Sequence, residues 1–520
     1  MSMVRYLALP MVAVAGWLVL HQLNRLPSLQ GRTASSVITD TASTRLGRAI
    51  APLAQAHPGL SGIVPLYRGL DAFAARVLLA DAAQRSLDVQ YYIWRADMSG
   101  TLLAQALHRA AARGVRVRLL LDDNNTGGLD PALAALDAHP NVEVRLFNPF
   151  ASRRWRALGY LTDFPRLNRR MHNKSFTIDN QATITGGRNV GDEYFSADAA
   201  MLFVDLDILA VGPVVSEVSS DFDRYWSSAS AYPVASLFSP AQSATSDPLA
   251  ARASLLEREP GALRYMRSLA VSAFVQRLLA GQLPLEWTRV RLVSDDPAKG
   301  LGLAPLEALV WQRLRKVLGG ATREVQLVTP YFVPTAAGVA ALAGLSAQGV
   351  QVSVLTNSLE ATDVLAVHAG YAKWRAPLLK AGIRLYEMKR GGMAPERGLR
   401  GSSASSLHAK VFAVDGARLF VGSFNFDPRS ANLNTEMGLA IDSAALAQEM
   451  REAASRQVPA LAYEVGLDER GQLQWLEQEQ LGHKPGSIAQ PVVHAQEPGA
   501  SRWQRLSVWF ISKLPVEWLL

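Results

Sequence analysis

The sequence contains no cysteine, which excludes disulfide bonds, thiolate catalysis, cysteine-ligated zinc and a lipid carried on an N-terminal cysteine. Charged residues are few, at 19% of the chain, and hydrophobic residues make up 49%, a composition typical of globular proteins. Acidic residues are the scarcer charged class, and the net charge of +8 favours an anionic partner such as nucleic acid, acidic lipid or phosphate. A length of 520 residues predicts two domains with tails.

Long hydrophobic runs are also scarce. Residues 1–28 contain one, an uncharged run from Tyr6 to Leu20, which is short for a membrane-spanning helix and also suits the core of a signal peptide. No Ala-x-Ala cleavage site follows it, so we interpret this segment as an uncleaved anchor, with a cleaved signal as the alternative. The few basic residues on its flanks indicate neither orientation across a membrane.

The C-terminal segment, residues 466–520, begins with a polar, Gln-rich stretch and ends in SRWQRLSVWFISKLPVEWLL. Trp503, Leu506, Phe510 and Leu514 recur at helical spacing, with basic residues among them. This pattern predicts an amphipathic helix, which either lies in a membrane interface or docks on the protein's own core.

Several stretches occur twice at a nearly constant offset. Gly114 of GVRVRLLLDD and Gly349 of GVQVSVLTNS are 235 residues apart, and His172 and His408 are 236 apart. Because strand-like segments alternate with helical ones, the repeat predicts an α/β protein with two similar lobes, residues 50–230 and 289–465. Each lobe is expected to be a mixed sheet flanked by helices, in which largely parallel strands are closed by an antiparallel hairpin. The lobes are expected to face each other across a pseudo-two-fold axis, with residues 231–288 as a connector.

The most informative repeat is the pair RRMHNKSFTID (169–179) and SSLHAKVFAVD (405–415). Residues of equal parity share one face of a strand, so His172 lies beside Lys174 and His408 beside Lys410. Asp179-Asn180 and Asp415-Gly416 are typical of two-residue hairpin turns. We therefore interpret both aspartates chiefly as turn and scaffold residues.

The returning strands end in Gly-Gly-x-Asn and Gly-Ser-x-Asn. Small residues there let a backbone approach a ligand, and each asparagine adds an amide donor, so we expect a phosphate site formed by Gly187, Asn189, Ser423 and Asn425. One histidine could attack phosphorus while the other donates and accepts the proton. The lysines would stabilise the developing charge, so neither a metal nor another cofactor is required.

An attacking imidazole needs an acceptor for its other nitrogen, usually a carboxylate. Asp205 and Glu436 each enter an apolar strand downstream of one motif. A carboxylate buried in such a strand is costly unless it is paired, and a histidine is a natural partner.

The segments HNKSFTID-x6-GGRN and HAKVFAVD-x6-GSFN resemble the paired HKD motifs of the phospholipase D superfamily. The resemblance implies a phosphohistidine intermediate, an active site between two lobes, and catalytic roles for the motif residues His172, Lys174, Asp179, His408, Lys410 and Asp415. It favours His172 as nucleophile and His408 as acid and base, and the reverse assignment is the alternative. It also places the orienting carboxylates at Asp205 and Glu436.

The segments DVQYYIW, SDDPAKG and LPVEWLL further resemble bacterial cardiolipin synthases of the C type, apart from an extra apolar N-terminus. This resemblance implies transfer of a phosphatidyl group, from phosphatidylethanolamine or phosphatidylglycerol, to phosphatidylglycerol at the bacterial inner membrane. The implied partners are phospholipids and a membrane surface, and a small companion protein is left open.

Three alternatives remain at this point. A phospholipase D hydrolase would use the same motifs with water as acceptor. An HKD nuclease would suit the basic charge and the six arginines of residues 153–170, but the apolar N-terminus and Trp-rich C-terminus disfavour nucleic acid as a partner. A non-catalytic membrane tether is disfavoured by two intact motifs.

Overall fold

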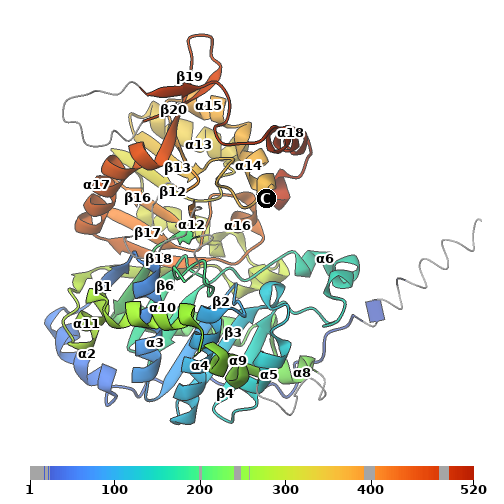
Figure 1. Ribbon diagram of the computed structural model, residues 1–520, viewed down its shortest axis with the longest axis vertical. Coiled ribbons are helices and arrows are strands. Elements are labelled where there is room, and N and C mark those ends of the chain that lie inside the picture. The colour runs from blue at the N-terminus through green and yellow to red at the C-terminus, as the bar shows by residue number, and fades with distance from the viewer. Residues whose placement is uncertain are drawn as a thin grey trace, which may run out of the picture.

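Figure 1 shows a computed structural model of the protein, in which two lobes are stacked along the longest axis. The structure describes residues 24–197, 202–238, 248–256, 258–391, 405–478 and 491–520, together with Trp17, His21 and Gln22. The predicted N-terminal anchor therefore lies mostly outside the described residues. Within the described ranges, no helix combines the length and hydropathy that a membrane span requires.

The first lobe is built on a nine-stranded sheet with the order β10-β1-β8-β6-β5-β2-β3-β4-β9. Only β2, β3 and β4 pair in parallel. The strands are β1 (Ser61–Leu66), β2 (Ser86–Tyr91), β3 (Arg116–Asp122), β4 (Val142–Phe147), β5 (Ser175–Ile178), β6 (Ala182–Gly186), β8 (Asp207–Val211), β9 (Ala231–Pro233) and β10 (Glu286–Thr288).

The second lobe repeats this arrangement in a ten-stranded sheet, with the order β11-β18-β17-β16-β12-β13-β14-β19-β20-β21. Again only three neighbouring strands, β12, β13 and β14, are parallel. The strands are β11 (Val290–Ser294), β12 (Glu324–Val328), β13 (Gln351–Asn357), β14 (Arg384–Met388), β16 (Val411–Val414), β17 (Arg418–Gly422), β18 (Met437–Asp442), β19 (Ala462–Leu467), β20 (Leu473–Glu477) and β21 (Val492–His494).

The sheets are therefore mixed, as predicted, and the parallel part of each consists of three neighbouring strands. Each motif strand returns through a connection of only three residues, 179–181 and 415–417, and such a short connection joins only antiparallel strands. The turn residues Asp179, Asn180, Asp415 and Gly416 all have positive φ, as a type I′ turn requires.

Helices cover the outer faces of both sheets (Figure 1). Those of the first lobe are α2 (Arg45–Ala56), α3 (Gly69–Ala82), α4 (Met98–Ala112), α5 (Asp130–Asp137), α6 (Gly159–Leu167) and α7 (Pro213–Trp226). Those of the second lobe are α12 (Val310–Leu318), α13 (Thr335–Ala347), α14 (Leu365–Ala372), α15 (Arg375–Lys380), α16 (Pro428–Asn432), α17 (Ala444–Leu461) and α18 (Arg502–Ile511). Short 3₁₀ turns include η2 (Arg156–Leu158), η4 (Pro297–Leu301) and η6 (Glu517–Leu519).

The connector is a helical part of the first lobe. Its helices are α8 (Val234–Leu237), α9 (Pro248–Leu256), α10 (Pro260–Ala270) and α11 (Ala273–Leu279). Tyr265, Leu269 and Phe274 from these helices are buried in the same core cluster as Phe73 of α3. The chain then passes from the first sheet to the second between Thr288 and Val290.

The second lobe extends further along the chain than the predicted end at residue 465. Strands β20 and β21 continue the sheet beyond β19, and Trp475 of β20 is buried in the core of this lobe. The polar composition of this region conceals the strands because they are the last two of the sheet, with β21 at its edge, and one face of them meets water.

The two lobes share a hydrophobic core where their antiparallel halves meet. Ile208 and Ala210 of β8 belong to one buried cluster with Val411, Val421 and Leu439 of the second sheet. Two short strands also cross the boundary, because β7 (Leu202–Val204) pairs in parallel with β15 (Ser405–Leu407). The lobe boundary is thus a packed interface, and both His-x-Lys motifs border it.

Candidate active site

His172 lies directly before β5 and is held by the opposite lobe. Its backbone nitrogen donates to the carbonyl of Thr435 at 2.9 Å, and its Nδ1 is 2.8 Å from Oε2 of Glu436. The ring is largely buried, and the edge of Tyr92 packs against it with centroids 4.9 Å apart. The backbone pair and the carboxylate together fix the position of the imidazole.

His408 has the same arrangement with the lobes exchanged. Its backbone nitrogen donates to the carbonyl of Val204 at 2.9 Å, and its Nδ1 is 2.6 Å from Oδ2 of Asp205. The ring of Tyr194 packs against it with centroids 5.2 Å apart. Each histidine is therefore oriented by a carboxylate from the other half of the chain.

The hydrogen bonds at Nδ1 determine the chemistry of both rings. A neutral imidazole that donates its Nδ1 proton to a carboxylate carries its reactive lone pair on Nε2. Burial lowers the pKa of His408 to about 4, with a further contribution from Lys410. Burial and the two lysines likewise lower the pKa of His172 well below its usual range. Both imidazoles are thus neutral near pH 7 in the absence of substrate.

The two carboxylates differ in their affinity for protons. Burial raises the pKa of Glu436 to about 7, although Lys174 opposes this shift. Burial also disfavours ionisation of Asp205, but His408 and Lys410 outweigh it and lower the pKa of Asp205 to about 2. The His172–Glu436 pair therefore retains an additional proton to a higher pH than the His408–Asp205 pair.

The motif lysines are buried beside the histidines. The ammonium groups of Lys174 and Lys410 donate to the carbonyls of His172 and His408, respectively. Burial lowers the pKa of Lys410 to about 8 and that of Lys174 well below its usual range. Each histidine is influenced electrostatically by both lysines, which places all four groups in one site. An anion bound there would favour the protonated form of both lysines.

The motif aspartates lie at the far end of the motif strands. Asp179 accepts hydrogen bonds from the backbone nitrogens of Arg85 and Ser86 at 2.7 and 2.9 Å, at the start of β2. Asp415 accepts from the backbone nitrogens of Arg323 and Glu324 at 2.8 and 3.1 Å, at the start of β12. These contacts tie the motif turns to the central strands, away from the imidazoles.

Gly187 and Ser423 contact the carboxylates that hold the histidines, and their contact with a phosphate stays a prediction. A Cβ atom on Gly187 would lie 2.1 Å from Oδ1 of Asp205, so this position must be glycine. The hydroxyl of Ser423 donates to Oε2 of Glu436 and accepts from the backbone nitrogen of Met437 at 3.0 Å. The small residues thus make room for, or bind, the groups that orient the histidines.

The two asparagines are not equivalent. Asn189 accepts from the backbone nitrogen of Ile93 at 3.2 Å and donates to the hydroxyl of Tyr194 at 3.1 Å, so protein groups occupy both ends of its amide. Oδ1 of Asn425 is buried without a hydrogen-bond partner among the described residues. Of the two, Asn425 is the better candidate for a contact with substrate.

The structure adds positioning residues that the sequence did not single out. Asp122, at the end of β3, binds the guanidinium of Arg170 at 2.7 Å and the backbone nitrogen of Met171 at 2.7 Å, directly before His172. Asp295 accepts from Lys299 and from the backbone nitrogen of Glu436, both at 2.8 Å. The sequence signal for both was an aspartate pair directly after an apolar strand.

The arginine-rich stretch before the first motif is largely engaged within the protein. Arg153 and Arg156 bind Asp130 at 2.6 and 2.9 Å, and Arg166 binds Asp163 at 2.5 Å. Arg154 differs, since it is exposed and lies over the ring of Trp155. These contacts leave little free guanidinium surface to follow a nucleic-acid backbone.

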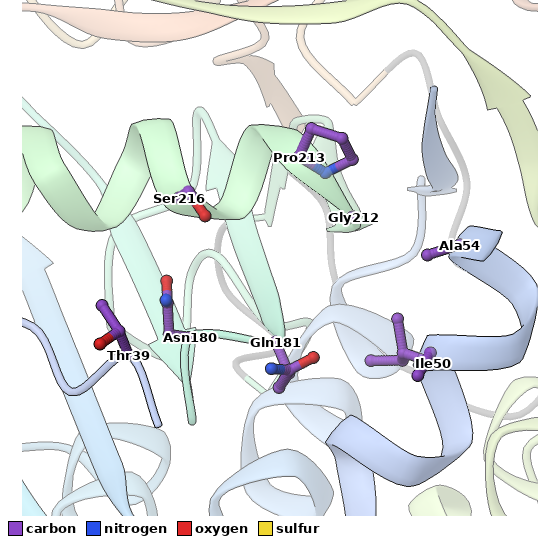
Figure 2. Close-up of a pocket in the computed structure, with 9 residues that line it drawn as sticks. Thr39, Ile50, Ala54, Asn180, Gln181, Gly212, Pro213 and Ser216 are labelled. Atoms are coloured by element: carbon purple, nitrogen blue, oxygen red, sulfur yellow. The ribbon is translucent and has the colours of Figure 1, made fainter. Parts of the chain in front are cut away.

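A half-open cavity of about 420 Å³ lies at the opposite end of the motif strand (Figure 2). Asn180 and Gln181, which follow β5, line it together with Ile50 of α2 and Ser216 of α7. It contains no ionisable side chain and is separate from the histidines, which precede β5. Among the described residues, no cluster of three or more histidines and carboxylates could hold a metal ion.

Comparison with known proteins agrees with this geometry. A family model described as "Cardiolipin synthase, PLD-like domain" matches residues 78–226 and 314–457. Cardiolipin synthase C of Escherichia coli (strain K12) is 49% identical over 480 residues, which cover 92% of this chain and 100% of that protein. The chain belongs to the phospholipase D-like cardiolipin synthase family. The predicted membership of the phospholipase D superfamily is thereby confirmed, and the protein is an enzyme of this superfamily.

Other relatives extend the comparison of this cardiolipin synthase family member. An uncharacterized protein of Helicobacter pylori (strain ATCC 700392 / 26695) is 33% identical over 424 residues, or 81% of this chain and 84% of that protein. Phosphatidylserine synthase of Haemophilus influenzae Rd KW20 has a similar structure, with a TM-score of 0.53 and 14% identity, over 81% of this chain and 91% of that one. The second likeness concerns the fold alone, and it confirms the predicted two-lobed α/β class.

Proposed function

We propose that the protein transfers a phosphatidyl group to phosphatidylglycerol, forming cardiolipin through a phosphohistidine intermediate. The observation that carries the proposal is the pair of neutral imidazoles, His172 and His408, each held at Nδ1 by a buried carboxylate and set beside two buried lysines. The similarity to cardiolipin synthase C supports phosphatidyl transfer in particular.

The reaction proceeds in two displacements at phosphorus. Binding of the anionic phosphodiester raises the pKa of the adjacent imidazoles, so one histidine takes up a proton on Nε2. Nε2 of the other, neutral histidine attacks the phosphorus of the donor lipid, a P–N bond forms, and the bond to the headgroup oxygen breaks as the protonated histidine donates its proton to that oxygen. The second histidine then removes the proton of a phosphatidylglycerol hydroxyl, which attacks phosphorus and breaks the P–N bond. Lys174 and Lys410 stabilise the charge on the non-bridging oxygens in both steps.

We assign the attack to His172, as the family resemblance implies. The proton affinities of the two pairs favour the reverse order, because the His172–Glu436 pair holds an additional proton up to about pH 7 and would serve well as the acid. Trapping the intermediate by a rapid quench in denaturant at alkaline pH, where the P–N bond is stable, followed by peptide mass spectrometry at neutral to alkaline pH, decides between them. A phosphatidyl adduct on the peptide containing His408 overturns our assignment while leaving the chemistry intact.

The hydrolase alternative shares every residue of the first displacement, and water replaces the lipid hydroxyl in the second. The test incubates the purified enzyme in detergent with labelled phosphatidylglycerol, with and without phosphatidylethanolamine. We expect cardiolipin from the wild type and none from His172→Ala or His408→Ala, with His108→Ala as a control outside the site. Phosphatidic acid as the sole product would identify a hydrolase, and cleavage of DNA with lipids untouched would identify a nuclease.

The enzyme is proposed to act at the bacterial inner membrane, where its lipid substrates reside. The apolar segment of residues 1–28 supports this location. Deleting this segment should release much of the protein from isolated membranes. If membrane association is unchanged, the segment is not the principal anchor. A small companion protein can be tested by comparing the activity of the purified enzyme with that of whole membranes.

A further inference from the structure

Two segments that flank the catalytic histidines expose large apolar side chains. The first segment consists of η2, α6 and Trp155, which directly precedes η2. The exposed fractions there are 60% for Trp155, 66% for Leu161 and 43% for Phe164. In α18, they are 77% for Trp503, 60% for Trp509 and 60% for Phe510. Single exposed apolar residues are common, but grouped tryptophan, phenylalanine and leucine mark an interaction surface.

Helix α18 has one face packed against the second lobe and another face that is exposed. Val508 on one side of this helix is buried against Ala369 of α14 and Leu359, so the helix is fixed to the second lobe. The tryptophans and Phe510 therefore remain exposed although the helix has already found its place in the fold. The docking that the sequence suggested as one alternative is therefore observed, and the opposite face of the helix is exposed.

The two exposed segments belong to one region of the molecule. In Figure 1, α6 and α18 lie on the same side, with the C-terminus between them. Arg429 joins them, because its guanidinium donates to the carbonyl of Leu519 at 3.0 Å and to that of Asn168, which directly follows α6, at 3.0 Å. Asn168 is only four residues from His172, so this region adjoins the catalytic site.

We propose that η2–α6 and α18–η6 form a membrane-binding face, which seats the enzyme on a bilayer containing anionic phospholipid. Tryptophans beside basic residues are typical of segments that lie in the headgroup region. Arg154, Arg502 and Lys513 are exposed on these segments. The nearby carboxylates of Asp163 and Glu517 are paired with Arg166 and Lys373, respectively, so the face is positively charged.

This inference deepens the proposed function and depends on it for its purpose, since a phosphatidyltransferase takes both substrates from a bilayer. The face places the catalytic histidines beside the headgroup layer, while the acyl chains of donor and acceptor remain in the membrane. A second copy of the chain could also cover an apolar face, and the test below separates the two occupants.

The absence of cysteine in the natural sequence makes a direct test available. Full-length Leu161→Cys and Leu506→Cys variants are labelled with an environment-sensitive fluorophore. The matched control is Val271→Cys, which directly follows α10 and is 80% exposed. In Figure 1, α10 lies away from α6 and α18. Labelled proteins are mixed with vesicles of phosphatidylglycerol and phosphatidylethanolamine that carry nitroxide groups on their acyl chains. We expect quenching at positions 161 and 506 and none at 271.

Two results would overturn the proposal. In the first, the labels at positions 161, 506 and 271 all show the same weak quenching, whether or not the protein floats with the vesicles. In the second, positions 161 and 506 become shielded without lipid as protein concentration rises, which identifies a second copy as the occupant.

A kinetic comparison separates this inference from the proposed function. The double variant Leu161→Ser/Leu506→Ser should lose about tenfold in rate on vesicles but keep its rate in detergent micelles. The variant Val271→Ser should be unaffected in both media. If the wild type transfers no phosphatidyl group in either medium while the labels are still quenched, the membrane-binding face stands and the proposed function fails.

Discussion

At the scale of single residues, the two imidazoles resemble each other in burial and in hydrogen bonding, but the carboxylates that hold them do not. Asp205 is a short side chain fixed against Gly187, and it also accepts from its neighbour's backbone nitrogen at 2.8 Å. Glu436 is longer, bound by a serine hydroxyl, and prone to take up a proton. The duplicated site is therefore symmetric in geometry and asymmetric in proton affinity.

The first prediction concerns these carboxylates. Asp205→Asn and Glu436→Gln should each lower the rate of phosphatidyl transfer by about 10²–10⁴-fold, because an amide does not hold the imidazole in the tautomer with its lone pair on Nε2. Rates in detergent micelles and thermal unfolding provide the measurement. Asp81→Asn, which removes an exposed ion-pair partner of Arg109 and Arg113, serves as the control. Full activity in a folded Asp205→Asn variant would contradict an orienting role.

A second prediction concerns pH. Burial raises the pKa of Glu436 from an ordinary 4.5 to about 7, so the folded protein binds this proton more tightly than the unfolded chain. The stability that this group contributes is present below about pH 4.5 and is lost as pH rises through about 7.

The comparison uses denaturant unfolding of wild type and Glu436→Gln at pH 5 and pH 8. The wild type should lose up to about 2–3 kcal/mol more than the variant between these values. An equal loss in both proteins would show that Glu436 does not titrate in this range.

At the scale of elements, the motif strands combine a reactive end and a structural end. The histidine and lysine precede the strand, whereas the aspartate begins the turn that follows it. The hairpin turns and the scaffold role of the aspartates could be predicted from Asp-Asn and Asp-Gly, because these pairs tolerate the positive φ that a type I′ turn requires. The phosphate-binding role of the adjacent small residues was expected from the same pattern, yet Gly187 and Ser423 contact carboxylates.

The third prediction tests whether the aspartate at the turn of each motif strand contributes to stability or to the chemistry. Asp179→Ala and Asp415→Ala should each reduce the free energy of unfolding by about 1–3 kcal/mol, because buried backbone donors at the start of β2 or β12 lose their acceptor. Asp179→Asn, which keeps positive φ accessible and retains one acceptor, should lose less. Unfolding curves and the rate per folded molecule are measured together. Loss of activity at unchanged stability would show that the aspartate acts in the chemistry.

Periodicity predicted the central strands and the helices that cover them, since buried parallel strands are nearly continuous apolar runs. It did not predict that β20 and β21 extend the second sheet. These last two strands of the sheet contribute few buried side chains, so their composition is close to that of a loop. Periodicity also could not distinguish the two faces of α18, because both are apolar. One face is buried against the second lobe, and the other is exposed.

At the scale of the whole molecule, the site exists only at the interface of the lobes. The sequence identified both histidines, both lysines and both carboxylates. It could not assign which carboxylate serves which histidine, because that pairing depends on how two separately folded sheets are placed against each other. Asp122 and Asp295 were missed for a similar reason, since their partners lie 48 and 141 positions away.

The fourth prediction tests this interface. The chain is divided between Gly281 and Gln282, both exposed and between α11 and β10, and the two fragments are produced together. Because the shared hydrophobic core and the β7–β15 pair hold the lobes, the fragments should copurify and form cardiolipin. Size-exclusion chromatography and the lipid assay give the result. Fragments that separate while each remains folded would contradict a tightly packed interface.

The exchange of carboxylates between the lobes has an evolutionary consequence. Neither repeat alone contains the acceptor that its own imidazole uses, so a single-copy ancestor would have needed a second identical polypeptide to complete its chemistry. Gene fusion would then have converted contacts between subunits into contacts within one chain. From that point the two repeats were able to diverge, as Asp205 and Glu436 have done. Because each carboxylate holds the histidine of the other repeat, a change in the carboxylate of one repeat alters the imidazole of the other.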